Sequence, residues 1–205
     1  MHGARQTRAL QVAGVFAALT LLVHLLTNRG YGYFRDELYF LACAEHLDWG
    51  YPDQPPLIAF IAWFSRHVIG ESLGAIRFLP AVAGAAKVFL TGLIAVELGA
   101  GAFAVGLACL CVLAAPGYLG LDTILSMNAF EPLFWMGSAY LALRATRHDR
   151  PRLWLWVGVL AGLGLENKHS MAFFLAALST GLLFSPQRRV LRSGWFWGGM
   201  GLALL

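Results

Sequence analysis

Residues 10–26 read LQVAGVFAALTLLVHLL, an apolar run that ends just before Asn28 and Arg29. A helix needs about 20 mainly apolar residues to cross the hydrocarbon core of a bilayer. Arg5 and Arg8 precede the run, as basic residues precede the apolar region of a secretory signal peptide, but the run is long and no small-x-small cleavage site follows it. We therefore expect an uncleaved first transmembrane helix.

The composition of the whole chain is that of a membrane protein. Apolar residues make up 59% of the 205 residues and charged residues 13%, and the mean hydropathy is +0.65. Soluble domains have about 45–50% apolar and about 25% charged residues. No basic cluster is interleaved with aromatic residues, which excludes a nucleic-acid-binding surface. The three cysteines show neither CxxC nor Cys/His spacing, so we expect no disulfide framework and no structural zinc site.

Further apolar segments predict five more spanning helices, at residues 78–98, 100–118, 127–143, 153–166 and 170–185. Another apolar helix begins at Trp195 and the sequence stops within it, which predicts a fragment of a longer chain. The segment Leu57–Ile69 is too short to span, so an interfacial or re-entrant helix is favoured there. The expected fold is all-α: a polytopic transmembrane helical bundle forming a single domain, residues 1–205.

The distribution of arginines orients this bundle. If 57–69 does not span and the N-terminus is cytoplasmic, the arginine-rich segments 144–152 and 188–192 both lie on the cytoplasmic side. If 57–69 did span, both segments would move outside, against the positive-inside rule. The first arrangement brings many polar residues to the outer face: Asp36, Glu37, Asp53, Asp122, Asn128, Glu131, Glu166, Asn167, Lys168 and His169. Because such residues are costly beside lipid, their convergence on one face indicates a functional site.

The predicted first outer loop, residues 30–72, contains the most informative motifs. Arg35-Asp36-Glu37-Leu38-Tyr39 opens an expected amphipathic helix, and the two carboxylates fall in its first turn. Carboxylates there also serve as ordinary N-terminal caps, which accounts for one of the pair better than for both. Asp53-Gln54-Pro55-Pro56-Leu57 reads as the start of a second juxtamembrane helix, since proline is favoured in the first turn.

Two later segments add polar residues to the same face. Asn128 reads equally well as a helix cap, whereas Glu131, at the membrane boundary before Pro132, is as readily functional as structural. The turn Glu166-Asn167-Lys168-His169 is most simply a solvated loop, but its lysine and histidine are also suited to binding an anion such as phosphate. Lys87, in the middle of an apolar segment, is expected to snorkel or to line a cavity.

These motifs resemble those of membrane glycosyltransferases of the GT-C fold. The likeness is greatest to the group of families 39 and 83, which includes protein O-mannosyltransferases and the lipid A aminoarabinose transferase. The Asp36-Glu37 pair followed by the Pro-Pro-Leu helix is similar to that group's first outer loop. Residues 122–133 are similar to its second outer loop, although an Asp-Pro is more usual where Glu131-Pro132 stands. The resemblance covers residues 10–185.

The resemblance implies an inverting glycosyltransferase, multi-pass in the bacterial inner membrane, with its active site on the outer face. The implied donor is a polyprenyl-phosphate sugar, and the acceptor is a glycan, lipid or protein. Asp36 or Glu37 is the implied catalytic base, and the pair also permits a divalent metal. The implied substrate-binding residues are Arg35, Tyr39, Asp53, Gln54, Asp122, Asn128, Glu131, Lys168 and His169.

Two other functions remain open at this point. In a transporter, Asp36, Glu37, Glu131 and Lys87 would line a path for an ion or substrate. Transporters place charges near the bilayer midplane and often contain inverted repeats, whereas the charges here gather at one face and no internal repeat is visible. The other alternative is a non-catalytic, lipid-binding membrane protein.

Overall fold

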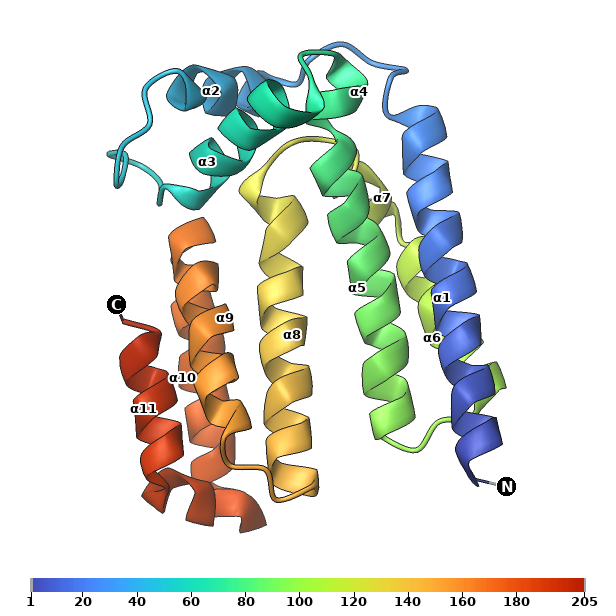
Figure 1. The fold of residues 1–205 in the computed structure, drawn as a ribbon, viewed down its shortest axis with the longest axis vertical. Coiled ribbons are helices and arrows are strands. Elements are labelled where there is room, and N and C mark those ends of the chain that lie inside the picture. The colour runs from blue at the N-terminus through green and yellow to red at the C-terminus, as the bar shows by residue number, and fades with distance from the viewer. Residues whose placement is uncertain (1, 205) are drawn as a thin grey trace.

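The structure, a computed structural model, describes residues 2–204, which are 77% helical and contain no strand. The long helices stand side by side, and α2 (Arg35–Ala44) and α3 (Leu57–Phe64) lie across one end of them (Figure 1). We call this the α2–α3 end; it also holds the turns 28–34, 122–126 and 168–170. The predicted all-α fold is confirmed.

The remaining helices follow in chain order. Their bounds are α1 (His2–Thr27), α4 (Leu73–Ile76), α5 (Phe78–Glu97), α6 (Ala102–Leu113), α7 (Pro116–Leu121), α8 (Met127–Arg147), α9 (Leu153–Asn167), α10 (Met171–Leu183) and α11 (Gly194–Leu202). A π-helical turn, Ser65–Ile69, extends α3, and a 3-10 helix, Pro186–Arg192, precedes α11.

Two helical segments of the described chain are long and apolar enough to cross a membrane, Gly3–Thr27 and Leu73–Glu97. Helices α6, α9 and α10 are apolar but shorter. The prediction of one continuous helix over 100–118 is wrong, because the helix breaks before Pro116, where Ala115 is extended with ψ 118°. Proline has no N–H to donate and disfavours helical geometry in the residue before it.

Small residues let the helices approach closely, as is common between membrane helices. Helix α1 packs on α5 at Gly92, where an added Cβ would lie 2.3 Å from the Cβ of Ala13. Helix α9 packs on α11 at Gly158, where an added Cβ would lie 2.0 Å from the carbonyl oxygen of Gly199. Both contacts exclude any larger side chain.

A hydrophobic core fixes α2 and α3 to the bundle beneath them. It contains Phe40 from α2, Ile58 from α3, Ile76 from α4, Leu125 from the turn before α8, and Phe130 from the first turn of α8. Because this core holds α2, the carboxylates in its first turn have a defined position. The opposite end of the bundle holds the N-terminus and the turns 98–101, 148–152 and 184–193 (Figure 1). We call it the basic end, since it gathers the arginine-rich segments.

Candidate functional site

Helix α2 begins directly after Phe34, so Asp36 and Glu37 both fall in its first turn. The backbone N–H of Phe34 donates a hydrogen bond to Glu37 Oε2 at 2.8 Å. A glutamate at this position commonly reaches back to a helix-start N–H that has no partner within the helix. Helix capping therefore explains why a carboxylate stands at Glu37, and it does not explain the carboxylate at Asp36.

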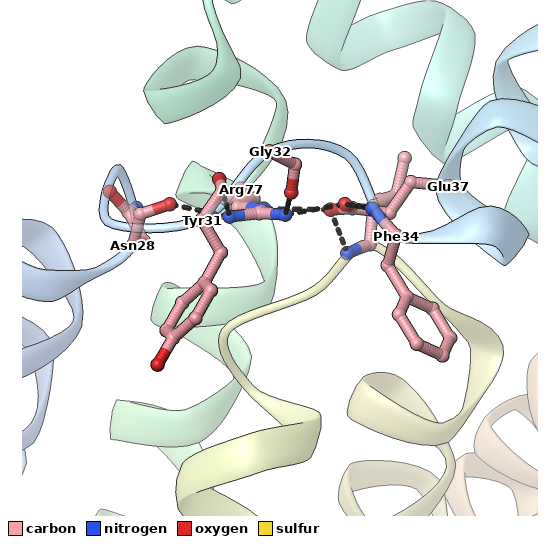
Figure 2. A network of polar contacts seen from close by, with 7 residues as sticks. Asn28, Tyr31, Gly32, Phe34, Glu37 and Arg77 are labelled. Atoms are coloured by element: carbon pink, nitrogen blue, oxygen red, sulfur yellow. Dashed lines mark hydrogen bonds and ion pairs between the residues drawn. The ribbon is translucent and has the colours of Figure 1, made fainter.

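Glu37 is also half of a fully buried ion pair with Arg77, the residue that joins α4 to α5 (Figure 2). Arg77 Nε lies 2.8 Å from Oε1, and Nη2 lies 2.6 Å from Oε2, so the contact is bidentate. The backbone N–H of Leu125 donates to Oε1 at 2.9 Å. With the Phe34 N–H, each carboxylate oxygen of Glu37 therefore accepts two hydrogen bonds.

The guanidinium of Arg77 organises the turn between α1 and α2. Its Nη1 donates to the carbonyl oxygens of Asn28 (2.7 Å) and Tyr31 (3.2 Å), and Nη2 donates to that of Gly32 (2.8 Å) (Figure 2). All five N–H groups of the arginine thus have acceptors. A lysine, with one ammonium, cannot reproduce this fork. The sequence did not single out Arg77, and its one signal was a cation at the start of an apolar helix.

Asp36 has a different environment from its neighbour. Its side chain is 40% exposed, and among residues 2–204 its one polar side-chain partner is Arg35, whose Nε lies 3.0 Å from Oδ1 and whose own side chain is 90% exposed. An exposed pair of this kind contributes little to stability. The Asp36-Glu37 pair is therefore divided: Glu37 is buried and saturated, whereas the Asp36 carboxylate has capacity to accept another proton or hydrogen bond.

The surroundings of this pair do not fit a metal ion. Both oxygens of Glu37 are engaged by nitrogen donors, so a cation would have to displace Arg77. Among residues 2–204 there is no group of three or more His, Cys, Asp or Glu side chains that could hold a metal.

Three other predicted substrate-binding residues join α2 to the start of α3. The hydroxyl of Tyr39 donates to Asp53 Oδ1 at 2.7 Å. Gln54 is buried, and its Nε2 lies 3.6 Å from the sulfur of Cys43. These contacts hold the loop 45–56 against α2, and contact with a substrate stays a prediction for all three.

The hydrogen bond to Asp53 raises the pKa of the Tyr39 phenol, because ionisation would place two negative oxygens 2.7 Å apart. Asp53→Asn is expected to move the Tyr39 titration towards lower pH. The measurement is an NMR titration of ¹³C-labelled tyrosine in detergent, with Tyr39→Phe to assign the signal. The pKa of the Tyr39 phenol is higher in the folded protein than in the unfolded chain. Its hydrogen bond to Asp53 therefore stabilises the fold fully at pH values below the unfolded pKa, and this stabilisation is lost as the pH rises through the folded pKa. An unchanged midpoint in Asp53→Asn would refute this cause.

A second polar cluster joins α8 to the turn before α10. Lys168 Nζ donates to Asn128 Oδ1 at 2.7 Å and to Glu131 Oε2 at 2.9 Å, and the hydroxyl of Ser170 donates to the other oxygen of Glu131. About a third of the Lys168 side chain is exposed. Its ammonium has three N–H groups, so one remains for a ligand. His169, next to it, is exposed.

Asp122 lies in neither cluster, since it forms a buried ion pair with Lys87 of α5. The expectation that Lys87 snorkels to the membrane surface is wrong, because its side chain is 1% exposed and its ammonium is bound within the bundle. Two apolar pockets, between α8 and α10 and between α10 and α11, are lined by none of the predicted site residues.

Comparison with known proteins gives a family. Residues 53–205, which are 153 of the 205, match the family described as dolichyl-phosphate-mannose-protein mannosyltransferase. No curated protein and no solved structure matches the chain. The matched segment begins after the Asp36-Glu37 pair and includes Arg77, Glu131 and Lys168. The chain therefore belongs to the dolichyl-phosphate-mannose-protein mannosyltransferase family, whose members are membrane glycosyltransferases.

Proposed function

We propose that the chain transfers a sugar from a polyprenyl-phosphate donor to an acceptor hydroxyl, with Asp36 as the catalytic base. Family membership supports the reaction class. The observation that carries the assignment of the base is the division of the carboxylate pair, in which Glu37 is saturated and Asp36 is 40% exposed. A lipid-linked donor also accounts for polar groups that gather where the apolar helices end.

The reaction proceeds as one displacement. The acceptor oxygen attacks the anomeric carbon as its proton passes to the Asp36 carboxylate, which acts as a general base. The bond between the anomeric carbon and the phosphate oxygen breaks, and its electron pair leaves with the polyprenyl phosphate. Because the acceptor enters opposite the leaving group, the anomeric configuration is inverted.

The departing phosphate needs nearby positive charge. Arg35 is adjacent to Asp36, is 90% exposed, and has a planar fork of donors that matches phosphate oxygens. Lys168 has one N–H to spare beyond Asn128 and Glu131, and His169 lies next to it. We assign these three cations to the phosphate of the donor.

The remaining polar residues at this end are assigned to the sugar and the acceptor, which is a glycan, a lipid or a protein. They present the carboxylate, amide and hydroxyl groups that recognise sugar hydroxyls. They are Tyr39, Asp53, Gln54, Asn128 and Glu131. Asp122, buried with Lys87, is assigned a different role below.

The proposed orientation of the chain in the membrane follows from the distribution of its arginines. The arginines of 144–152 and 188–192 and the N-terminal arginines lie together at the basic end. The positive-inside rule assigns such an end to the cytoplasm. The α2–α3 end would then face outward from a bacterial inner membrane. The lipid-linked sugar donor would have to be presented on that outer face.

Donor profiling tests the function. The purified chain in lipid vesicles is given polyprenyl phosphates carrying labelled mannose, glucose or aminoarabinose, together with a detergent-free extract of bacterial cell envelopes as the acceptor source. We expect covalent label in the acceptor fraction from at least one lipid donor and none from a nucleotide sugar. Label that crosses the bilayer without covalent transfer would instead indicate a transporter, and donor binding alone would indicate a lipid-binding protein.

A further inference from the structure

A second buried ion pair lies between α5 and the segment after α7. Lys87 donates to Asp122, and the two side chains are 1% and 3% exposed. The Lys87 ammonium also lies 4.6 Å from the centre of the Tyr118 ring. Removing two charges from water is costly for each ion, and a pair recovers this cost only in good geometry. Apolar replacement of such a pair is often neutral for stability, so stability alone does not account for these two charges.

The backbone around Asp122 is held from two helices. An added Cβ at Gly84 of α5 would lie 2.6 Å from Asp122 Oδ2, so the carboxylate packs directly on the α5 backbone. The hydroxyl of Thr123 donates to the Leu119 carbonyl at 2.7 Å and lies 3.3 Å from Nδ1 of His24 in α1. Asp122 and Thr123 are therefore fixed between α1 and α5.

The segment that follows reaches the carboxylate pair. Leu125, three residues after Asp122, is fully buried, and its N–H donates to Glu37 Oε1 at 2.9 Å. Glu37 lies in the same helical turn as Asp36, so the position of one carboxylate fixes the position of the other. A continuous connection thus runs from the Lys87–Asp122 ion pair along the backbone to Leu125, and through the Leu125 hydrogen bond to Glu37, which lies beside Asp36.

We propose that Lys87 and Asp122 are positioning residues for sugar transfer. Their ion pair sets the segment 122–126 against Glu37, and Glu37 in turn fixes the first turn of α2, which carries Asp36. The proposal rests on the proposed function, because Asp36 must be placed against the acceptor hydroxyl for the reaction to occur. A misplacement of about 1 Å at such a site can lower the rate by about 100-fold.

Removal of both charges separates positioning from folding. Lys87→Met alone leaves a carboxylate buried without a partner and is expected to destabilise the protein. Lys87→Met with Asp122→Leu removes both charges and is expected to fold. We expect the double variant to lower kcat by about tenfold or more, with the donor KM within about twofold of wild type. A folded double variant with wild-type kcat would overturn the proposal.

Two glycines provide a test that changes no charge. Gly84→Ala places a methyl group against the Asp122 carboxylate, whereas an added Cβ at Gly120 of α7 meets nothing within 4 Å. Gly84→Ala is expected to lower kcat by about tenfold, and Gly120→Ala to keep wild-type activity. Wild-type activity in both variants would also overturn the proposal.

Hydrogen exchange supplies a readout that does not depend on catalysis. With the full chain in lipid nanodiscs, the amide of Leu125 should exchange faster in the double variant and in Gly84→Ala than in wild type. Amides of α9 serve as the internal control and should not change. Unchanged Leu125 exchange would contradict this connection. Suppose that the wild type transfers no sugar but Leu125 exchanges faster in both variants. That result would count against the proposed function and would still support the contact between segment 122–126 and Glu37.

Discussion

Glu37→Gln is expected to lower the free energy of unfolding by about 3–5 kcal/mol, because it leaves the Arg77 guanidinium buried without a counter-charge. Arg77→Met should have an effect of similar size, since it strands the Glu37 carboxylate and also frees the carbonyls of Asn28, Tyr31 and Gly32. Thermal or denaturant unfolding in detergent, followed by circular dichroism, measures both. Loss of sugar transfer in these variants would follow from loss of structure.

The Arg66–Glu71 pair at the same end provides the matched control. Its atoms are 3.6 Å apart and the two side chains are 35% and 79% exposed. Glu71→Gln should therefore change stability by less than about 1 kcal/mol. If Glu37→Gln were no more destabilising than Glu71→Gln, the structural role of the buried pair would be wrong.

Asp36→Asn is expected to have the opposite profile: normal folding with sugar transfer reduced about 10²–10⁴-fold, the usual contribution of a general base. Stability should hold because the carboxylate is 40% exposed and paired with one exposed arginine. Asparagine keeps the size and the acceptor oxygen but cannot take the proton. Steady-state transfer from the best donor, with unfolding measured on the same preparation, checks both parts.

The control for Asp36→Asn is a second carboxylate variant that is measured under the same conditions. Glu71→Gln should keep wild-type transfer, because that carboxylate is exposed and weakly paired. A rise in donor KM with unchanged kcat in Asp36→Asn would assign Asp36 to binding and remove it from the proton transfer.

The sequence predicted the features that depend on local pattern. Apolar runs gave the all-helical fold, and helix-start chemistry placed Asp36 and Glu37 in a first turn. The error at 100–118 arose because hydropathy does not register the missing N–H of Pro116. Sequence patterns over a few residues could thus locate the helices and most of their ends.

The sequence could not separate the roles of Asp36 and Glu37. The partner of Glu37 is Arg77, 40 residues further along the chain, and the pairing depends on how α5 begins against α2. Lys87 and Asp122 are 35 residues apart, and Glu131 and Lys168 are 37 apart. Such pairs form through tertiary packing, so local spacing carries no signal of them. The turn at 166–169 likewise read as solvated, although Asn167 is buried and its Nδ2 donates to the carbonyl of Met127.

The most direct test of the central claim, that Asp36 takes the proton while Glu37 holds the fold, is the rate of a single turnover with donor and acceptor bound. The chain is reconstituted in vesicles with saturating labelled polyprenyl-phosphate sugar, and the first cycle of covalent transfer is followed in wild type and Asp36→Asn. We predict a first-cycle rate at least about 100-fold lower in Asp36→Asn, with an unchanged unfolding temperature. A first-cycle rate equal to that of wild type would contradict the account.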